Sequence, residues 1–444
     1  MTEEAFSRQR PREFDGTSPA ERAVFEATAA LLSETSLQEL TVAQILELGG
    51  LSRANFYHYF ANKHQVLVAM LARLFDEGYA QNPPWESSPG RGRARTMGAS
   101  LDHTLRLWSR HGAVICAVVE HMHGEPAVAR AWQPTYRRFH AAVAEQIEHE
   151  RRTGRAPDGP PADMVAAMLI CGVERALYVS SRGLDLQLPT PESVVDSLVA
   201  LNEVAIYGGR QDKIGPMVEP VQPQLEGADA SDEVRADERA VREHSETAQS
   251  ILNAMRDLLL TYTLAELSVA KIIDHASVSR ASFYFYFRSR DDAFAALFSV
   301  AAENMVVKMA EIAGDDRSAS DSPGRTAQAF KHWLDLDEMT TTVIRNAVHE
   351  WPRRLELRTI YLSAVATLAR HLETIIVAAR TRGDAISWPP APQYAATLIW
   401  MIERTVAGSL ADEEHLRDFA GVKKCSHNFF RMRSMVVGDV FTGR

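Results

Sequence analysis

Residues 41–63 read TVAQILELGGLSRANFYHYFANK, and residues 268–290 read SVAKIIDHASVSRASFYFYFRSR. Both stretches contain a polar cap, a short apolar helix, a turn, a second cap and a second helix rich in aromatic residues. A pattern that recurs at a fixed offset is typical of a tandem duplication. We therefore predict that this chain carries two helix-turn-helix units.

Local signals place the helix boundaries of the first unit. Ser18-Pro-Ala-Glu21 and Thr41-Val-Ala-Gln44 have the composition of capping boxes, which begin helices. Gly49-Gly50 is suited to a turn, and Ser52 is suited to cap the helix that runs to Phe60. The order helix, turn, helix follows from these signals.

The duplication extends beyond the helix-turn-helix pattern. It matches without a gap from Ser18 against Ser245 to Ala69 against Ala296. Farther along the chain, Pro160-Pro161 matches Pro389-Pro390. The pair Glu174-Arg175 likewise matches the pair Glu403-Arg404. The repeated segment therefore covers whole domains.

Helical periodicity dominates the chain, and neither an alternating apolar run nor an Asn-Gly hairpin signal stands out, so we predict an all-α fold. Long helices are expected at 63–80, 93–110, 113–123, 126–153, 162–183 and 191–208, with the same order repeated from about 290 to 440. The expected domains are a disordered basic arm (1–15), a first helix-turn-helix domain (16–62), a first larger helical domain (63–210), a linker (211–243), a second helix-turn-helix domain (244–289) and a second larger helical domain (290–444).

Bulk composition indicates a globular protein. The chain has 444 residues, of which 46% are hydrophobic and 24% charged, enough for two halves with separate cores. We find no unbroken apolar run of the roughly 18 residues that a membrane span needs, and the first residues, MTEEAFSRQRPREF, are too polar for a secretory signal. We expect a cytoplasmic protein without a membrane partner.

Charge is distributed unevenly. The net charge of −10 argues against indiscriminate nucleic-acid binding, whereas cations gather locally in the second helix-turn-helix stretch. Arg8, Arg10 and Arg12 form a basic N-terminal arm. This arm could enter a minor groove, although a solvated, disordered terminus is the favoured interpretation.

Signals for catalysis or metal binding are weak. Cys116, Cys171 and Cys425 lie far apart among apolar residues without metal-ligand spacing, so we expect buried thiols. His121 and His123 stand at i and i+2, which places them on different faces of a helix. We found no nucleophile, phosphate loop or paired carboxylates. We therefore predict no catalytic residues, no metal and no cofactor, and an enzyme is the weak alternative.

The second helix of each unit has the residues of a DNA reader. Arg53 can contact guanine bidentately, Asn55 can contact adenine, and Ala54 is small enough to meet a thymine methyl group. A generic amphipathic helix is the plain alternative, which the doubled motif disfavours. The predicted DNA contacts are Thr41, Ser52, Arg53, Ala54, Asn55, Tyr57, His58 and Lys63 in the first unit and Ser268, Ser279, Arg280, Ala281, Ser282, Tyr284, Phe285 and Arg290 in the second.

The motif Ser-Arg-Ala-(Asn/Ser)-Phe-Tyr-x-Tyr-Phe, followed three residues on by a cation, resembles the signature of the TetR family of transcriptional regulators. The resemblance implies a three-helix DNA-binding domain, a larger helical ligand domain with an apolar pocket, and dimerisation through the last two helices. In this sequence Ser277 replaces the turn glycine seen as Gly50, and positions 55/282 and 58/285 differ between the units. We therefore expect two related but unequal DNA half-sites.

Residues 169–178 and 200–208 also resemble the C-terminal helices of the ethionamide-resistance repressor group, whose long pocket accepts lipophilic ligands. That group often has an Asn before Glu-Arg, where this chain has Val173 and Ile402. Aromatic stripes on helices are more often core than ligand contacts. The predicted pocket residues are Trp108, Met122, Trp132, Tyr136, Phe139, Ile170 and Val173 in the first half and Trp333, Met339, Trp351, Tyr361, Ile399 and Ile402 in the second.

Together these features predict a ligand-responsive repressor. One chain would act as a covalent pseudo-dimer on an imperfect palindrome of double-stranded operator DNA, and an apolar small molecule would release it. The alternative is a ligand-binding or protein-interaction module in which one or both helix-turn-helix units are vestigial. Activation instead of repression, and the pairing of two chains, stay open.

Overall fold

The structure is a computed structural model, and it describes residues 18–78, 91–208, 246–318, 333, 336–383 and 385–419. Within these ranges the chain is helical and has no β-strand, so the predicted all-α fold is confirmed. The predicted basic arm, the predicted linker and Cys425 lie outside the described residues.

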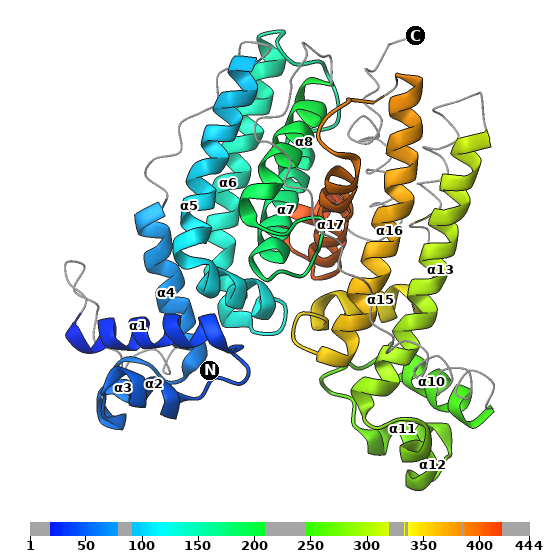
Figure 1. The fold of residues 1–444 in the computed structure, drawn as a ribbon. Coiled ribbons are helices and arrows are strands. Elements are labelled where there is room, and N and C mark those ends of the chain that lie inside the picture. Colours follow the sequence, from blue (N-terminus) through cyan, green and yellow to red (C-terminus); the bar gives the residue numbers. More distant parts are fainter. Residues whose placement is uncertain are drawn as a thin grey trace. The chain divides into compact units, whose positions relative to one another are not determined.

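The helices occur in a repeated order (Figure 1). In each half a helix-turn-helix segment is followed by longer helices. The elements of the first half are α1 (Pro19–Glu34), α2 (Val42–Gly49), α3 (Arg53–Tyr59), α4 (Lys63–Gly78), α5 (Arg91–His121), α6 (Pro126–Arg152), α7 (Ala162–Ser181), the 3₁₀ helix η2 (Pro191–Val194) and α8 (Val195–Tyr207). Those of the second half are α10 (Glu246–Leu258), α11 (Val269–Ala276), α12 (Arg280–Tyr286), α13 (Arg290–Ser318), α15 (Glu338–Glu350), α16 (Leu355–Arg382), α17 (Ala391–Leu410) and the 3₁₀ helix η3 (Glu414–Phe419).

Two helix predictions need correction. The segments predicted separately at 93–110 and 113–123 form the single helix α5. Gly112 lies inside it, and a glycine weakens a helix by only about 1 kcal/mol without ending it. The segment predicted at 191–208 begins as the 3₁₀ turn η2 before α8.

The chain forms two compact units. The first contains α1–α4 with residues 100–139, and its core is built from apolar faces of α1, α2, α3 and α4. Val114, Ala117 and Val118 of α5 complete this core. The first helix-turn-helix therefore packs directly on the end of a long helix.

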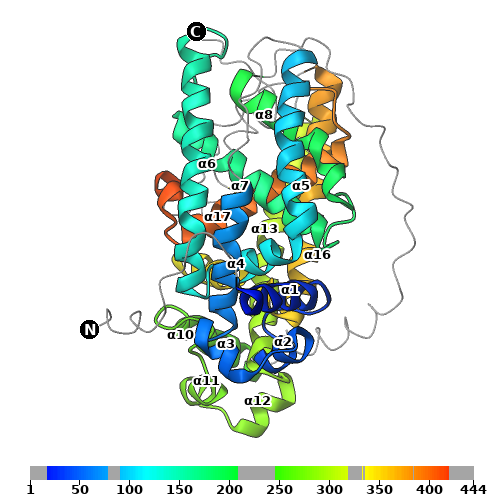
Figure 2. The same ribbon diagram turned by 90° about the vertical axis from the view of Figure 1, so that its left-hand side faces the viewer.

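The second unit contains residues 85–99 and 140–444. In it α10 packs on α11, α12 and α13, as α1 packs on α2, α3 and α4 in the first unit. The helix α13 lies along α16, α16 packs on α17, and α17 packs on α7. Figures 1 and 2 show α10, α11 and α12 at one end of α13 and α16. Helices from both halves of the sequence thus share one core.

The packing of α7 on α17 is close. Both helices have 20 residues, and nearly all of each is buried. A Cβ atom built on Gly172 of α7 would lie 3.2 Å from Cγ of Met401 on α17, so the glycine permits this approach.

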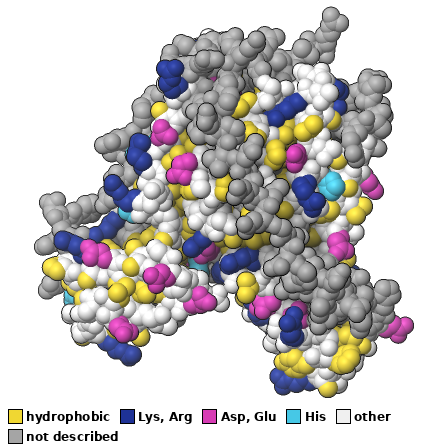
Figure 3. Space-filling model, viewed as in Figure 1, with side chains coloured by type: hydrophobic (Ala, Val, Ile, Leu, Met, Phe, Trp, Pro, Cys, Tyr) yellow, Lys and Arg dark blue, Asp and Glu magenta, His cyan; other side chains and the backbone are white. Residues whose placement is uncertain are grey.

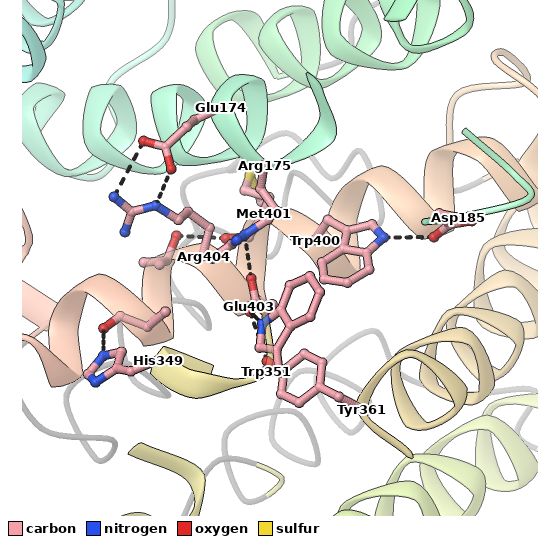
Figure 4. Close-up of polar contacts among 12 residues, drawn as sticks. Glu174, Arg175, Asp185, His349, Trp351, Tyr361, Trp400, Met401, Glu403 and Arg404 are labelled. Carbon is pink, nitrogen blue, oxygen red and sulfur yellow. Dashed lines mark hydrogen bonds and ion pairs between the residues drawn. The ribbon is translucent and has the colours of Figure 1, made fainter. Parts of the chain in front are cut away.

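Buried charges pair reciprocally across these two helices (Figure 4). Nε of Arg404 donates to Oε1 of Glu174 at 2.6 Å, and Nε of Arg175 lies 2.7 Å from Oε2 of Glu403. Arg404 also donates to both carboxylate oxygens of Glu413 at 3.0 Å. All four members of the reciprocal pairs are buried, which is tolerated because each charge has an opposite partner.

Three helical segments in the described residues are long and apolar enough to cross a membrane, judged by length and composition. They are 162–181, 290–314 and 355–382, in α7, α13 and α16. The apolar window of the first is 83% buried inside the protein, and Glu174 and Arg175 interrupt it. Packing on α17 accounts for the composition of α7, and the cytoplasmic location stays a prediction.

We predict that Arg175→Met lowers the free energy of unfolding by about 3–5 kcal/mol, because it leaves the Glu403 carboxylate buried without its partner charge. Adding Glu403→Gln should restore most of this loss, since an amide oxygen still accepts hydrogen bonds but carries no charge. Urea unfolding measures both changes. Arg288→Met, at an arginine with an 81% exposed side chain near Asp292, is the control and should cost under about 1 kcal/mol. An equal loss of unfolding free energy in Arg175→Met and Arg288→Met would contradict a stabilising buried pair between Arg175 and Glu403.

Candidate nucleic-acid interface and ligand cavity

Side-chain caps fix the first helix-turn-helix. Oγ1 of Thr41 accepts from the backbone N of Gln44 at 3.3 Å, and Oε1 of Gln44 accepts from the backbone N of Thr41 at 2.8 Å. Oγ of Ser52 accepts from the backbone N of Asn55 at 3.2 Å. Gly50 ends α2 with φ of 60°, in the left-handed region that glycine adopts without strain. These caps and the turn agree with the sequence interpretation.

The second helix-turn-helix repeats the geometry. Oγ of Ser268 accepts from the backbone N of Lys271 at 3.3 Å, and Oγ of Ser279 accepts from that of Ser282 at 3.0 Å. At the position of Gly50 stands Ser277, with φ of 54° and ψ of 40°. A serine in this conformation is strained, since its Cβ approaches the backbone.

The helices α3 and α12 each have one buried aromatic anchor, Phe56 and Phe283, respectively. Tyr57 and Tyr284 point outward, at 55% and 47% exposed, whereas Tyr59 and Tyr286 are half-buried. Most of the predicted DNA contacts are exposed: Thr41, Ser52, Arg53, Ala54, Asn55, Tyr57, His58, Ser268, Ser279, Arg280, Ala281, Tyr284 and Phe285. Figure 3 shows Lys and Arg side chains beside hydrophobic ones at the end formed by α11 and α12.

The cations that follow the two helices make contacts that the sequence did not suggest. Nζ of Lys63 donates to the carbonyl oxygens of Gln38 and Leu40, both at 2.9 Å. Nη1 of Arg290 donates to the carbonyl oxygen of Leu267 at 2.7 Å. Burial lowers the pKa of Lys63, against the smaller opposing effect of Glu125. Each cation therefore holds the residue before a cap and positions the start of α2 or α11.

The second helix-turn-helix is also tied to the helices that follow it. The backbone N of Leu264, before α11, donates to Oδ1 of Asn346 on α15 at 2.9 Å. Asp291, in the first turn of α13, accepts from Arg354, which also donates to Glu350. The sequence interpretation missed Asn346 and Arg354, because their partners lie far away along the chain.

An apolar cavity lies among α13, α15, α16 and α17, and its volume is about 80 Å³. Four predicted pocket residues line it, namely Trp333, Tyr361, Ile399 and Ile402. Trp351 is buried and stacks on Tyr361, with ring centroids 4.9 Å apart, and Met339 is half-buried in the first turn of α15. Neither is among the lining residues. The sequence interpretation missed the other lining residues, which are Phe298, Ala302, Met305, Leu336, Ile344, Val348, Ala364, Val365, Leu368, Glu403 and Val406.

Hydrogen-bonded side chains around Glu403 connect the cavity to the α7–α17 interface. The hydroxyl of Tyr361 donates to Oε1 of Glu403 at 2.8 Å, and Nε1 of Trp351 donates to the same oxygen at 3.1 Å. Burial, together with Glu403, raises the pKa of Tyr361 well above its usual value, so the phenol stays protonated and donates. The other oxygen of Glu403 faces Arg175, as Figure 4 shows.

The predicted pocket residues of the first half have other surroundings. Met122 and Trp132 pack with the core of the first helix-turn-helix. Trp108 and Tyr136 are buried. The other three, Phe139, Ile170 and Val173, are half-buried. A ligand pocket in the first half of the chain stays a prediction.

The helices α3 and α12 are suited to the major groove. Each has seven residues, follows a serine N-cap and has an arginine in its first turn. This arrangement defines a helix-turn-helix DNA-binding protein that carries its reading unit twice.

Comparison with known proteins identifies the family. Residues 24–70 and 251–297 match the bacterial regulatory proteins of the tetR family, and residues 97–208 match the C-terminal domain of the transcriptional regulator EthR. The HTH-type transcriptional regulator EthR of Mycobacterium tuberculosis is 28% identical over 189 residues, which cover 42% of this chain and 87% of that protein. Its namesake from Mycolicibacterium smegmatis is 28% identical over 193 residues, covering 42% and 86%, respectively. The chain belongs to the TetR family and is a DNA-binding transcriptional regulator with a tandem duplication.

We predict that Ser277→Gly raises the free energy of unfolding by about 1 kcal/mol, because glycine adopts the left-handed conformation without strain. The inverse change, Gly50→Ser, should lower it by a similar amount at the matching turn. Denaturant unfolding followed by circular dichroism checks both variants. A destabilised Ser277→Gly protein would show that the serine side chain has a stabilising role here.

Proposed function

We propose that this regulator is a ligand-released repressor in which one chain acts as a covalent pseudo-dimer. The reciprocal pairs Glu174–Arg404 and Arg175–Glu403 support this proposal most directly. In a two-fold interface, residue i of one copy contacts residue j of the other, and j contacts i in return. The two repeats meet in this pattern within one chain, as two subunits would.

The family resemblance assigns dimerisation to the last two ligand-domain helices, and α7 and α17 are matching helices of the two repeats. Their packing buries the surface that a separate subunit would otherwise cover. Because both copies are on one chain, their association is intramolecular and does not weaken on dilution. A single chain would therefore supply both reading helices.

The operator would be an imperfect palindrome of double-stranded DNA. In this proposal α3 and α12 read half-sites about one helical turn, roughly 34–36 Å, apart. Arg53 and Arg280 would contact guanine, and Tyr57 and Tyr284 would hold phosphates. Lys63 and Arg290 would serve mainly to position the caps, since they already bind backbone carbonyls.

The effector would be an apolar small molecule that enters the cavity of the second half. The cavity of about 80 Å³ is smaller than the roughly 300–1,000 Å³ of typical ligand pockets, so an occupant has to displace lining helices. Among these is α13, which lines the cavity through Phe298 and Met305 and begins at Arg290, beside the second reading unit. A preference of about 1–3 kcal/mol for the displaced state would suffice to release DNA.

We predict that Arg53→Ala and Arg280→Ala each weaken operator binding by about 1–3 kcal/mol and relax the preference for one base. Gel-shift or anisotropy titrations on the footprinted operator and its single-base variants measure this loss. Arg370→Ala, at an exposed arginine of α16, is the matched control and should bind as the parent protein does. Loss from only one of the two changes would indicate that the other unit is vestigial, and no loss from either would favour a ligand-binding or interaction module.

We predict that Ala364→Leu keeps operator affinity but abolishes release by the effector, because the larger side chain fills the cavity. Ala366→Leu, two residues along α16 and exposed, should still respond. Operator release is measured by anisotropy while an apolar effector, found by screening against the parent protein, is titrated. A fully responsive Ala364→Leu variant would place the effector elsewhere.

A further inference from the structure

The two reading helices have the same backbone frame. Each has seven residues, begins after a serine cap and ends with a phenylalanine C-cap at φ of −135°. The anchor rings have the same setting, since Phe56 meets Tyr57 at 5.3 Å and Phe283 meets Tyr284 at 5.4 Å, both edge to face. Differences in base preference therefore have to come from side chains that differ at matching exposed positions.

One such difference is Asn55 against Ser282. The Asn55 side chain is exposed and makes no hydrogen bond to another described residue, so its amide is available to an adenine edge. Oγ of Ser282 instead lies 2.8 Å from Oγ of the cap residue Ser279, and Ser282 is half-buried. The second helix thus loses a polar reader at this position.

The other difference is His58 against Phe285. Phe285 is 77% exposed, the highest value for any large hydrophobic side chain in the described residues. Its ring meets Tyr286 edge to face at 4.9 Å, and His58 meets Tyr59 in the same way at 4.8 Å. Phe283 and Phe287 already fill the core beneath α12. Phe285 is therefore not needed as a core residue, and its apolar surface lies open to solvent.

We propose that Phe285 determines specificity by contacting the methyl group of a thymine in its half-site, whereas the matching position of α3, His58, makes a polar contact. The inference rests on the proposed operator binding and deepens it. A thymine methyl group is the apolar feature of the major groove, and covering it removes apolar surface of both partners from water. The two half-sites would be read by different chemistry, so the operator is directional.

Uracil replacement tests this directly, because deoxyuridine keeps every hydrogen-bonding group of thymidine and lacks only the methyl group. Each thymine of the footprinted operator is replaced singly, and dissociation constants are measured by anisotropy. We expect operator affinity to fall about four-fold when a thymine in the half-site of α12 is replaced. This corresponds to roughly 0.8 kcal/mol, the free energy of burying one methylene-sized apolar group. The half-site of α12 is the one in which Arg280→Ala relaxes base preference.

Two reciprocal variants complete the test. With Phe285→His the uracil sensitivity of that half-site should disappear, and with His58→Phe a new sensitivity should arise in the other half-site. Both positions are exposed, so both variants should fold, which circular dichroism checks. An operator that binds tightly but tolerates uracil at every position overturns this inference alone. Absence of any operator binding by the parent protein overturns the proposed function and this inference together.

Discussion

Two carboxylate–guanidinium pairs are buried where α7 packs on α17, and they are the interaction on which the second unit depends. Leaving any one of these four buried charges without its partner would cost about 3–5 kcal/mol, so the helices favour a register that satisfies both pairs. Gly172 permits the close approach that brings the pairs together. The partners are about half a chain apart in sequence, so these contacts join a helix of the first repeat to a helix of the second within this unit.

The same interface adjoins the cavity. Glu403 faces Arg175 through one oxygen and accepts from Tyr361 and Trp351 through the other. The cavity in turn is lined by α13, whose first residue, Arg290, donates to the carbonyl oxygen of Leu267 before α11. These contacts connect the interface, the cavity and the start of the second helix-turn-helix.

Much of the fold followed from local sequence signals. The caps at Thr41, Ser52, Ser268 and Ser279 were predictable because each interaction spans three residues. The continuity of α5 was not predictable from the sequence, because a glycine such as Gly112 can stand either inside a helix or at its end.

Long-range contacts could not be read from the sequence. The pairs Glu174-Arg175 and Glu403-Arg404 were visible as repeats, but that they pair with each other depends on the packing of α7 on α17. Lys63 and Arg290 were predicted as DNA contacts, and no local sign in the sequence indicated that each also binds a carbonyl oxygen about twenty residues earlier. Of the residues predicted for a ligand pocket, Trp333, Tyr361, Ile399 and Ile402 line the cavity, whereas Trp351 stacks on Tyr361 without lining it.

The central claim is that one chain supplies both halves of a two-fold DNA reader. The most direct test is the mass of the protein–operator complex by native mass spectrometry, at nanomolar concentration and on a duplex that carries one footprinted site. The account predicts one chain of 49.3 kDa on each duplex. A complex that holds two chains on every duplex, with no single-chain species as the protein is diluted, would contradict it.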